Sequence, residues 1–458
     1  MNVSSDELDT LQQKDAAHHI HPFSDMRSLN ATGTRIIDHA EGVYVYEQNG
    51  HQLLDCMSGL WCVNMGYSRQ DICDAVSDQM KRLPFYNSFF QCTHAPAIEL
   101  ATELCKIAPD HLNHVFFTGS GSECNDTVLR FSRRYWALRG QPDKDVIISR
   151  KNAYHGSTVA GASLGGMAPM HEQGSLPIPG IVHIDQPYWF GEGGDEDQNE
   201  FGLRISRQLE EKILELGVDK VAAFIGEPIQ GAGGVIIPPD SYWPEIQRIC
   251  DQYGILLIAD EVITGYGRTG NWFASETYGI KPDFICSAKG LSSGYLPIGA
   301  VYVSDRVADL LIDECGEIAH GFTYSGHPAC CAAALANIKA MHDENIIERI
   351  QNDIAPYLQK RWRELADHPI VGEVRGIGMI GALELVADKN SRARFSDEVN
   401  AGLICRNNCV KNGLIMRSCG ETMVISPPFI ITHEQVDELI AKARQSLDDT
   451  LADIKNSQ

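Results

Sequence analysis

Seven short apolar runs, separated by amphipathic segments, occupy the middle of the chain and constrain its fold more than any other feature. They lie at 114–119, 146–150, 181–185, 222–228, 256–260, 284–289 and 299–304. Helical patterns lie between several of them, at 122–139, 203–217 and 241–253. This alternation is typical of a mostly parallel sheet with helices on both faces. We therefore predict an α/β fold built around such a sheet.

The sequence on either side of this region has a different pattern. Upstream, "VYVYEQNGHQLLD" predicts a hairpin around Asn49 and Gly50, a pair that suits the positive backbone angles of a tight turn. Downstream, "VGEVRGIGMIGALELV", "LIMR" and "MVIS" are typical of strands, and helical patterns lie between them near 395–412 and 433–449. We predict a separate α+β domain in the last third, joined by a long helix that starts near Pro328.

The charge balance and the lack of long apolar stretches limit the partners. The chain has 458 residues, with 38 basic and 61 acidic side chains and a formal net charge of -23. No cluster of Lys and Arg could follow a phosphate backbone, so we expect no nucleic-acid partner. Neither a signal peptide nor a run of about 18 apolar residues occurs, so we expect a soluble, cytoplasmic protein without a membrane partner.

Cysteine and histidine give no sign of a disulfide framework or a metal site. The fourteen cysteines are scattered through a long chain without a Cys-x-x-Cys pair, which favours free thiols. His18, His19 and His21 lie in an N-terminal arm, and the pair His111 and His114 lacks nearby cysteine ligands. We therefore expect no metal.

The run 256–260 ends in two adjacent carboxylates, Asp260 and Glu261, and then enters a glycine-rich turn. Gly265, Gly267 and Gly270 in "GYGRTG" match the spacing of the dinucleotide-binding fingerprint. The match is weak, because "DEVIT" separates the turn from the strand and "NWFASETYG" follows where a helix should open. A nicotinamide-dependent dehydrogenase is therefore a distant alternative.

A lysine in the next apolar run gives a better account of the carboxylate at this strand end. Lys289 ends the run "FICSAK", 29 residues after Asp260. Neighbouring parallel strands would bring both side chains to the same carboxyl edge of the sheet, where ligands bind in open α/β folds. Pyridoxal phosphate needs this pair. A lysine amine forms a Schiff base with it, and an aspartate keeps its ring nitrogen protonated so that the ring can accept electrons.

The segment "FFTGSGSECNDTVLR" could seat the phosphate of such a cofactor. It predicts a strand, a turn at 119–122 and then a helix, whose free N–H groups and dipole suit an anion. A simple helix cap is the other interpretation. In "KNAYHGST", Tyr154 could lie flat on a pyridine ring, with His155 and Gly156 packed behind it.

Six motifs occur in an order and spacing that resemble a known family. They are "GSGSECND", "YHGST", "GEPIQGAGG", "DEVITGYGRTG", "SAKGLSSGYLPIGA" and "GFTYSGHPACCAAA". Together they resemble the class III (subgroup II) pyridoxal-phosphate-dependent aminotransferases, and most closely the ω-transaminases, or amine–pyruvate and putrescine–pyruvate aminotransferases. The resemblance runs from about residue 23 to about 440, and its most specific part is the pairing of Asp-Glu-Val with a downstream Ala-Lys-Gly.

The resemblance implies the aspartate-aminotransferase-like fold of pyridoxal-phosphate enzymes. A large cofactor-binding domain with a mostly parallel seven-stranded sheet would span 66–328. A smaller α+β domain would combine the N-terminal segment 1–65 with the C-terminal residues 329–458. Thr323 in "GFTYSGHP" would reach the phosphate of a neighbouring subunit. The resemblance therefore also implies a homodimer, or a tetramer, with active sites at the subunit interface.

The resemblance also implies roles for individual residues around pyridoxal 5'-phosphate. Lys289 would carry the cofactor and move the proton, and Asp260 would pair with the ring nitrogen. Val262 and Tyr154 would pack on the two ring faces, and Glu227 would orient the network unless it is only a buried structural carboxylate. The full set of expected cofactor contacts is Ser120, Gly121, Ser122, Tyr154, His155, Glu227, Asp260, Val262, Lys289 and Thr323.

The expected reaction is a ping-pong transfer of an amino group from a primary amine or diamine to pyruvate, which gives an aldehyde or ketone and alanine. Arg417 in "NGLIMRSCGETMVISPP" would clamp the carboxylate of the acid and move away for the amine. Ala232 stands where relatives acting on ornithine or γ-aminobutyrate carry a glutamate that neutralises such an arginine. The side chains expected to line the amine pocket are Phe23, Leu60, Trp61, Phe85, Phe89 and Tyr154. A β-alanine–pyruvate aminotransferase, an aminomutase or a racemase on the same scaffold is the alternative.

Overall fold

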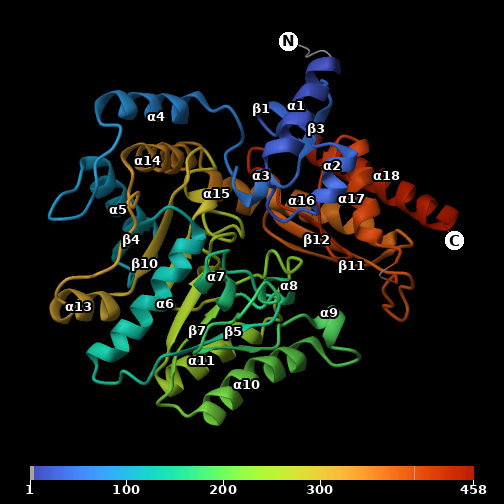
Figure 1. Ribbon diagram of the computed structural model, residues 1–458. Coiled ribbons are helices and arrows are strands. Elements are labelled where there is room, and N and C mark those ends of the chain that lie inside the picture. The colour runs from blue at the N-terminus through green and yellow to red at the C-terminus, as the bar shows by residue number, and fades with distance from the viewer. Residues whose placement is uncertain (1–4, 397, 458) are drawn as a thin grey trace.

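A seven-stranded sheet forms the centre of the computed structural model, which describes residues 5–396 and 398–457 (Figure 1). In spatial order its strands are β4 (His114–Thr118), β10 (Gly299–Val303), β9 (Phe284–Ser287), β8 (Leu256–Asp260), β7 (Val221–Gly226), β5 (Val146–Arg150) and β6 (Ile181–Ile184). All neighbours are parallel except β10, which runs antiparallel to both β4 and β9. The predicted α/β fold with a mostly parallel sheet is confirmed.

Helices cover both faces of this sheet because successive strand residues point to opposite sides. Ile147, Ile225 and Ile258 belong to a core that includes residues of α6 (Gly121–Leu138) and α13 (Asp305–Glu314). Their neighbours Ile148, Phe224 and Leu257 belong to a second core, formed with α10 (Gln198–Leu216) and α11 (Tyr242–Tyr253). The central strands are therefore apolar on both faces, which explains their continuous apolar runs.

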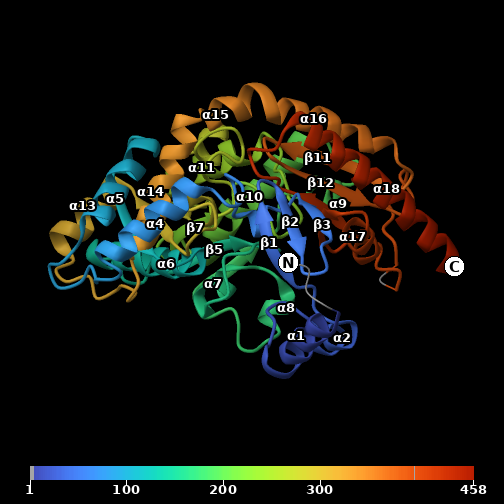
Figure 2. The same ribbon diagram turned by 90° about the horizontal axis from the view of Figure 1, so that it is seen from above.

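The two ends of the chain meet in a second sheet. Its order is β1 (Ile37–Glu41), β2 (Tyr44–Glu47), β3 (Gln52–Asp55) and β13 (Leu414–Ile415), with β3 and β13 parallel. The predicted hairpin at Asn49 and Gly50 joins β2 to β3. Figures 1 and 2 show these blue N-terminal strands beside the red C-terminal part of the chain.

A third, antiparallel sheet comes from the C-terminal part alone. It contains β11 (Val371–Ile377), β12 (Ile380–Leu385), β15 (Thr422–Ile425) and β14 (Arg417–Cys419) in that order. The prediction that "LIMR" forms one strand was wrong, because β13 pairs with the N-terminal hairpin and β14 pairs with β15. The chain thus passes from one sheet to another at Met416.

The remaining elements connect and cover these sheets. The long helix α14 (Pro328–Asp343) begins at Pro328 as predicted, α17 (Ala401–Lys411) begins later than the pattern near 395 indicated, and α18 (His433–Ser457) is longer than predicted. The others are α1 (Ser5–His18), α2 (Met26–Thr32), α3 (Ser58–Trp61), α4 (Gln70–Arg82), α5 (Ala95–Ile107), α7 (Val159–Leu164), α8 (Ala168–His171), α9 (Trp189–Glu192), α12 (Ala274–Thr277), α15 (Ile346–Arg349), α16 (Ala355–Arg363), and the short turns η1 (Lys289–Leu291), η2 (Ile350–Ile354) and η3 (Glu364–Asp367). Among the described helices, none is both long and apolar enough to cross a bilayer.

One buried arginine joins the loop that follows β8 to both ends of the chain. The guanidinium of Arg268 donates to the backbone carbonyls of Pro427 at 2.6 Å and Met379 at 3.3 Å, and also to the side chain of Asn64. These partners come from the N-terminal segment and from the C-terminal third. The carboxyl end of the central sheet is therefore tied at one point to the N-terminal segment and to the ends of strands in the third sheet.

Candidate active site

A cavity of about 1670 Å³ opens at the carboxyl ends of β7, β8 and β9. Glu227, Asp260 and Lys289, which stand at or just after these three strand ends, all line it. Trp61 from the N-terminal segment and Arg417 from β14 line it as well. The structure thus brings the aspartate and lysine of the sequence prediction into one pocket between the sheets.

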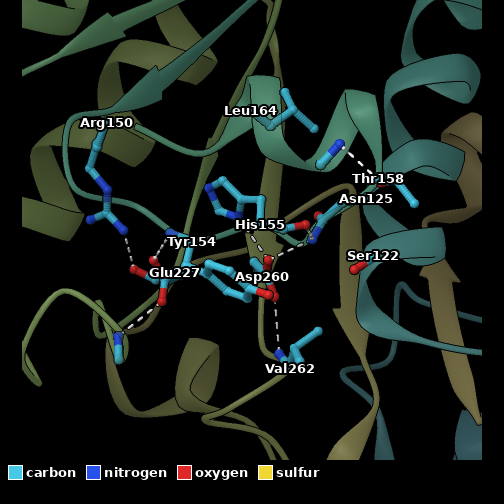
Figure 3. Close-up of polar contacts among 12 residues, drawn as sticks. Ser122, Asn125, Arg150, Tyr154, His155, Thr158, Leu164, Glu227, Asp260 and Val262 are labelled. Atoms are coloured by element: carbon cyan, nitrogen blue, oxygen red, sulfur yellow. Dashed lines mark hydrogen bonds and ion pairs between the residues drawn. The ribbon is translucent and has the colours of Figure 1, made fainter. Parts of the chain in front are cut away.

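Asp260 is the last residue of β8, is almost completely buried, and accepts three hydrogen bonds (Figure 3). His155 Nδ1 lies 2.7 Å and Asn125 Nδ2 lies 2.8 Å from the same carboxylate oxygen. The backbone N–H of Val262 donates to the other oxygen at 3.1 Å. Donors on both oxygens fix the orientation of a buried carboxylate. Asp260 is therefore held in one position at the floor of the pocket.

Asn125 is a residue of this network that the sequence prediction missed. Its amide nitrogen donates to Asp260 and also to the backbone carbonyl of His155, at 2.8 Å in both cases. It lies on the buried side of α6, one turn after the glycine-rich turn at 119–122. A polar amide on the apolar face of an amphipathic helix is the signal that could have identified it, because such a group requires a buried partner.

Glu227 fixes the segment that carries Tyr154. Its two carboxylate oxygens accept from the backbone N–H groups of Tyr154 at 3.1 Å and Gly231 at 2.9 Å. Burial raises the pKa of its carboxyl group, and the charges of His155 and Arg150 act in the opposite direction. Arg150 donates to the backbone carbonyl of Glu227 at 2.5 Å. The strand end, the buried arginine and the Tyr154 segment are therefore held together (Figure 3).

Lys289 lies two residues after the end of β9 and opens the short turn η1. Its φ of 42° lies in the left-handed region, which costs free energy in a non-glycine residue and often occurs at functional sites. Desolvation in the pocket lowers the pKa of its amine, although the charges of Cys62, Asp260 and Glu227 raise it. A lowered pKa increases the fraction of neutral amine, which is the nucleophilic form.

The turn between β4 and α6 has the geometry of an anion site. Ser120 caps α6 by accepting from the backbone N–H of Glu123 at 3.2 Å, and Glu123 accepts in turn from the N–H of Gly119 at 2.6 Å. The first N–H groups of the helix have no intrahelical acceptor, and together with the helix dipole they suit a phosphate. Gly121 is needed here, because a Cβ at this position would lie 2.8 Å from a methyl of Val262.

Two sides of this turn are held by the pocket wall. The backbone N–H of Ser157 donates to Ser122 Oγ at 3.1 Å, and a Cβ on Gly156 would lie 2.4 Å from the same oxygen. All four residues of 119–122, together with Gly156 and Val262, line the cavity. The structure therefore places an anion seat, a buried carboxylate and a lysine around one space.

Aromatic and cationic side chains form the mouth of the pocket. Trp61 is 2% exposed, and the guanidinium carbon of Arg417 lies 5.1 Å from its ring centroid. Phe23 is exposed and makes an edge contact with Tyr154, with the ring centroids 6.3 Å apart. Leu60 and Ala232 also line the cavity. Arg417 makes no ion pair with any described residue, so its charge is available to a ligand.

Three predicted site residues do not line the pocket of their own chain. Phe85 packs against Tyr324, with ring centroids 5.6 Å apart, on the loop between α4 and α5. Phe89 lies beside Gly321, where a Cβ would be 2.9 Å from its ring. Thr323 is exposed on the same surface. Within one chain Phe85 and Phe89 lie outside the pocket because their loop packs on the segment 318–326, and their role in an amine pocket stays a prediction.

The structure also describes two groups that the sequence did not favour as sites, the glycine-rich turn after β8 and the N-terminal histidines. Gly265, Gly267 and Gly270 lie in turns, and the next helix, α12, begins only at Ala274, so the dinucleotide geometry is not formed. His19 Nδ1 and His21 Nε2 each lie 3.0 Å from Asp15 Oδ1, which the sequence prediction did not group with them. Hydrogen bonds lower the pKa of Asp15 to about 2, the largest effect coming from Thr34.

The chain matches known proteins over almost its full length. A family model described as aminotransferase class-III matches residues 27–447. The putrescine–pyruvate aminotransferase of Pseudomonas aeruginosa is 59% identical over 435 residues, with 95% of each chain covered. The mitochondrial gamma aminobutyrate transaminase 1 of Solanum lycopersicum is 43% identical and covers 91% of this chain and 81% of that protein.

Solved structures agree with these sequence matches. The omega transaminase of Pseudomonas jessenii in complex with PMP superposes with a TM-score of 0.95 at 40% identity, covering 97% of this chain and 99% of that one. An (S)-enantioselective omega-transaminase from Thermomicrobium roseum gives a TM-score of 0.94 at 41% identity, with 97% and 99% of the chains covered. The chain therefore belongs to the class-III aminotransferases, and it is a transaminase that uses pyridoxal 5'-phosphate.

Proposed function

We propose that the protein is an ω-transaminase that moves an amino group from a primary amine or diamine to pyruvate. The observation that carries this proposal is one pocket that combines Asp260 with donors on both oxygens, a desolvated Lys289, and an Arg417 that makes no ion pair with any described residue. The 59% identity with a putrescine–pyruvate aminotransferase supports the choice of substrates. The pocket must therefore accept two classes of substrate, one with a carboxylate and one without.

The residues present fit pyridoxal 5'-phosphate. Its ring, when bound, withdraws electrons from the substrate carbon and so stabilises the negative charge that develops there. Ser120, Gly121 and Ser122 would hold the phosphate at the N-terminus of α6. Asp260 would accept from the ring nitrogen, and Val262 and Tyr154 would flank the ring. His155 and Asn125 keep Asp260 oriented.

Lys289 would hold the cofactor and then move the proton. Its amine must be neutral to attack an aldehyde, and the desolvation that lowers its pKa favours that form. Once substrate has displaced the lysine amine, the same Nζ can take the proton from the substrate carbon and later donate it to a different carbon. The charges of Asp260 and Glu227 raise the pKa of the Lys289 amine, and the charge of Arg417 lowers it.

Arg417 would bind the carboxylate of pyruvate or alanine and leave the site for an amine. Its guanidinium rests on the face of Trp61, which keeps it at the pocket wall without a counter-ion. Ala232 offers no carboxylate to hold it there permanently. Two parallel charge-assisted hydrogen bonds to a substrate carboxylate would supply roughly 1.5 to 3 kcal/mol.

We further propose a homodimer in which each chain completes the site of the other. The support is an exposed aromatic patch, defined as the exposed side chains Phe85, Tyr86 and Phe90 of the loop between α4 and α5 together with Tyr324 and the aliphatic Ile318 of the segment 318–326, which also carries the exposed Thr323. Large exposed apolar patches mark interaction surfaces. In this proposal Thr323 reaches the phosphate, and Phe85 and Phe89 reach the amine pocket, of the neighbouring subunit. A tetramer made of two such dimers fits the same contacts.

We also propose a division into a large domain, 66–328, and a smaller domain made of 1–65 and 329–458. The parallel pairing of β3 with β13 supports it, because this sheet takes strands from both chain ends. A cytoplasmic location belongs to the same proposal. All fourteen cysteines are unpaired, as expected in a reducing compartment.

A panel of donors tests the reaction. Specificity constants for putrescine, β-alanine and an aromatic amine should be measured with pyruvate and with 2-oxoglutarate as acceptors. We expect a visible absorbance that bleaches when amine alone is added and returns with pyruvate, and a clear preference for pyruvate. Strong preference for 2-oxoglutarate would contradict the proposed acceptor, and interconversion of one amine without any oxo acid would indicate an aminomutase.

A further inference from the structure

The loop 318–326, which carries Thr323, is attached to α6 by one histidine. His320 Nε2 lies 2.9 Å from Thr127 Oγ1, and its Nδ1 lies 2.6 Å from a guanidinium nitrogen of Arg130. Arg130 also donates to the backbone carbonyl of Ala319 at 2.9 Å. Thr127 and Arg130 are both on α6, less than one turn apart. The start of the loop is therefore fixed to this helix through side-chain hydrogen bonds.

The hydrogen-bond directions at His320 are determined by its partners. A guanidinium can only donate, so Nδ1 must be the acceptor and the neutral ring must carry its proton on Nε2. Nε2–H then donates to Thr127 Oγ1, whose own hydroxyl donates to the backbone carbonyl of Glu123 at 2.7 Å. Desolvation, with the charge of Arg130, lowers the pKa of His320 to about 4. The ring is therefore neutral at physiological pH, as this arrangement requires.

The ring is also enclosed by aromatic side chains. It stacks on Phe116 with an interplanar angle of 7° and a centroid distance of 5.4 Å. Phe131 and Phe322 meet it edge-on, at 5.8 Å and 5.1 Å. Packing on three sides restricts the ring to one orientation. The hydrogen bonds of His320 therefore hold the loop in a fixed position relative to α6.

Thr323 stands at the tip of a turn that begins two residues after His320. The N–H of Phe322 donates to Ser325 Oγ at 3.2 Å, and the N–H of Ser325 donates to the carbonyl of Phe322 at 3.0 Å. The far end of the loop is held by His94, whose Nε2 lies 2.8 Å from the carbonyl of Gly326. Thr323 is thus an exposed residue on a turn whose two ends are anchored.

The same helix serves the anion seat of its own chain. Glu123, whose carbonyl accepts from Thr127, places its carboxylate on the N–H of Gly119 in the turn 119–122. A continuous chain of hydrogen bonds therefore runs from this turn through Glu123, Thr127 and His320 to the Thr323 loop. In a dimer, one end of that chain faces the phosphate of its own subunit and the other faces the phosphate of the partner.

We propose that His320 is a positioning residue that sets Thr323 for the cofactor phosphate of the partner subunit and links it to the phosphate seat of its own chain. The inference rests on the proposed role of Thr323. It assigns to His320 an effect on cofactor retention that acts through Thr323 rather than through the stability of the loop alone.

A double-mutant cycle tests this proposal. His320→Phe keeps the aromatic packing but removes both hydrogen bonds, and Thr323→Ala removes the phosphate contact. Equilibrium dialysis of the holoenzyme gives the dissociation constant of pyridoxal phosphate for each variant, and light scattering gives the oligomeric state. We expect each single variant to release the cofactor about 10-fold more readily, equivalent to about 1.4 kcal/mol. The double variant should differ from Thr323→Ala by no more than about 2-fold, because coupled residues are not additive.

The outcomes separate this inference from the proposed function. Unchanged cofactor retention in Thr323→Ala would contradict the proposed phosphate contact of Thr323. It would also overturn the inference about His320, which rests on that contact. A loss in Thr323→Ala without a loss in His320→Phe, or losses that multiply in the double variant, would overturn only the role of His320. Thr127→Val removes the partner of Nε2–H with little change of shape. It should reproduce the His320→Phe result, and it replaces that variant in the cycle if His320→Phe does not fold.

Discussion

Asp260 accepts three hydrogen bonds, from His155, Asn125 and the backbone of Val262, and still faces the pocket. Asp260→Asn keeps the shape but removes the charge and turns an amide N–H toward one of these donors. We expect the variant to fold and to lose turnover by about 100-fold or more, because the ring nitrogen loses its anionic partner. Single-turnover absorbance measurements with an amine would report this loss directly.

Asn125 provides the matched control for this experiment. Asn125→Leu leaves the charge of Asp260 in place and removes one of its donors. A hydrogen bond to a charged group is worth roughly 1.5 to 3 kcal/mol, so we expect a loss of about 10-fold or somewhat more, smaller than that of Asp260→Asn. Near-native turnover in Asp260→Asn would show that the carboxylate serves packing rather than chemistry.

Arg417 differs from the other pocket residues because only one of the two substrates needs it. Arg417→Ala should weaken the use of pyruvate and alanine by about 10-fold or more, since two charge-assisted hydrogen bonds are lost. The half-reaction with an amine that has no carboxylate should change much less. Stopped-flow measurement of each half-reaction separates the two effects.

The conservative variant Arg417→Lys refines this test. It keeps the charge but loses the planar, bidentate geometry, so pyruvate use should fall between that of the wild type and that of Arg417→Ala. Equal losses in both half-reactions would instead indicate that Arg417, through its contact with Trp61, supports the pocket wall.

At the scale of elements, the N-terminus of α6 is pressed against the segment that follows β8. A Cβ at Gly121 would lie 2.8 Å and 2.9 Å from the two methyl carbons of Val262. Gly121→Ala should therefore push the turn 119–122, which forms the anion seat, away from Val262. Overpacking typically costs about 1–3 kcal/mol, so we expect cofactor retention to fall about 10-fold, as measured by dialysis of the holoenzyme.

Removing the obstructing methyl groups should reverse part of this effect. In the Gly121→Ala/Val262→Ala double variant both Cγ atoms are gone, and retention should exceed the product of the two single effects. Purely multiplicative losses would mean that Gly121 is required for some reason other than its contact with Val262.

Elements that bury both faces were predictable, and those defined by long-range pairing were not. The apolar run that ends at Asp260 was predicted as a central strand, and the placement of Asp260 and Lys289 at the same edge of the sheet followed from the sequence alone. The split of "LIMR" depends on β3, about 360 residues earlier in the chain, and no local pattern records that pairing. Local periodicity determines an element, but its partner is chosen in three dimensions.

The same limit applies to the site. Lys289 and Asp260 could be predicted because each closes an apolar run, which is an unusual place for a charge. The partners of Asn125 and His320, which are Asp260 and Thr127, lie 135 and 193 residues away, so no local pattern could name them. Phe85 and Phe89 are exposed or half-buried aromatics outside the pocket, and their proposed role requires a second chain.

At the scale of the whole molecule, the exposed aromatic patch should hold the proposed dimer together. Tyr86 belongs to this patch and is 50% exposed, and Tyr86→Asp would bury a charge in the proposed interface. We expect the variant to dissociate at concentrations where the wild type is dimeric and to lose activity on dilution. Light scattering coupled to size exclusion measures the first effect.

A matched control comes from an apolar residue on another surface. Leu214 on α10 is 60% exposed and lies outside the patch, so Leu214→Asp should leave the oligomeric state unchanged. Dissociation of both variants would indicate a general loss of stability, and a dimeric Tyr86→Asp protein would place the interface elsewhere.

The passage of the chain from β13 to β14 has a consequence for how quickly the pocket can adapt. Arg417 is the first residue of β14, and its backbone is fixed by pairing with Val424 directly after β13 joins the other sheet. Its backbone is therefore held, while its side chain makes no ion pair with any residue that the structure describes. Rotamer changes take picoseconds to nanoseconds, whereas domain closure takes microseconds to milliseconds. We therefore expect the exchange between amine and oxo acid to be governed by side-chain rotation, with no relaxation of the domains setting its rate.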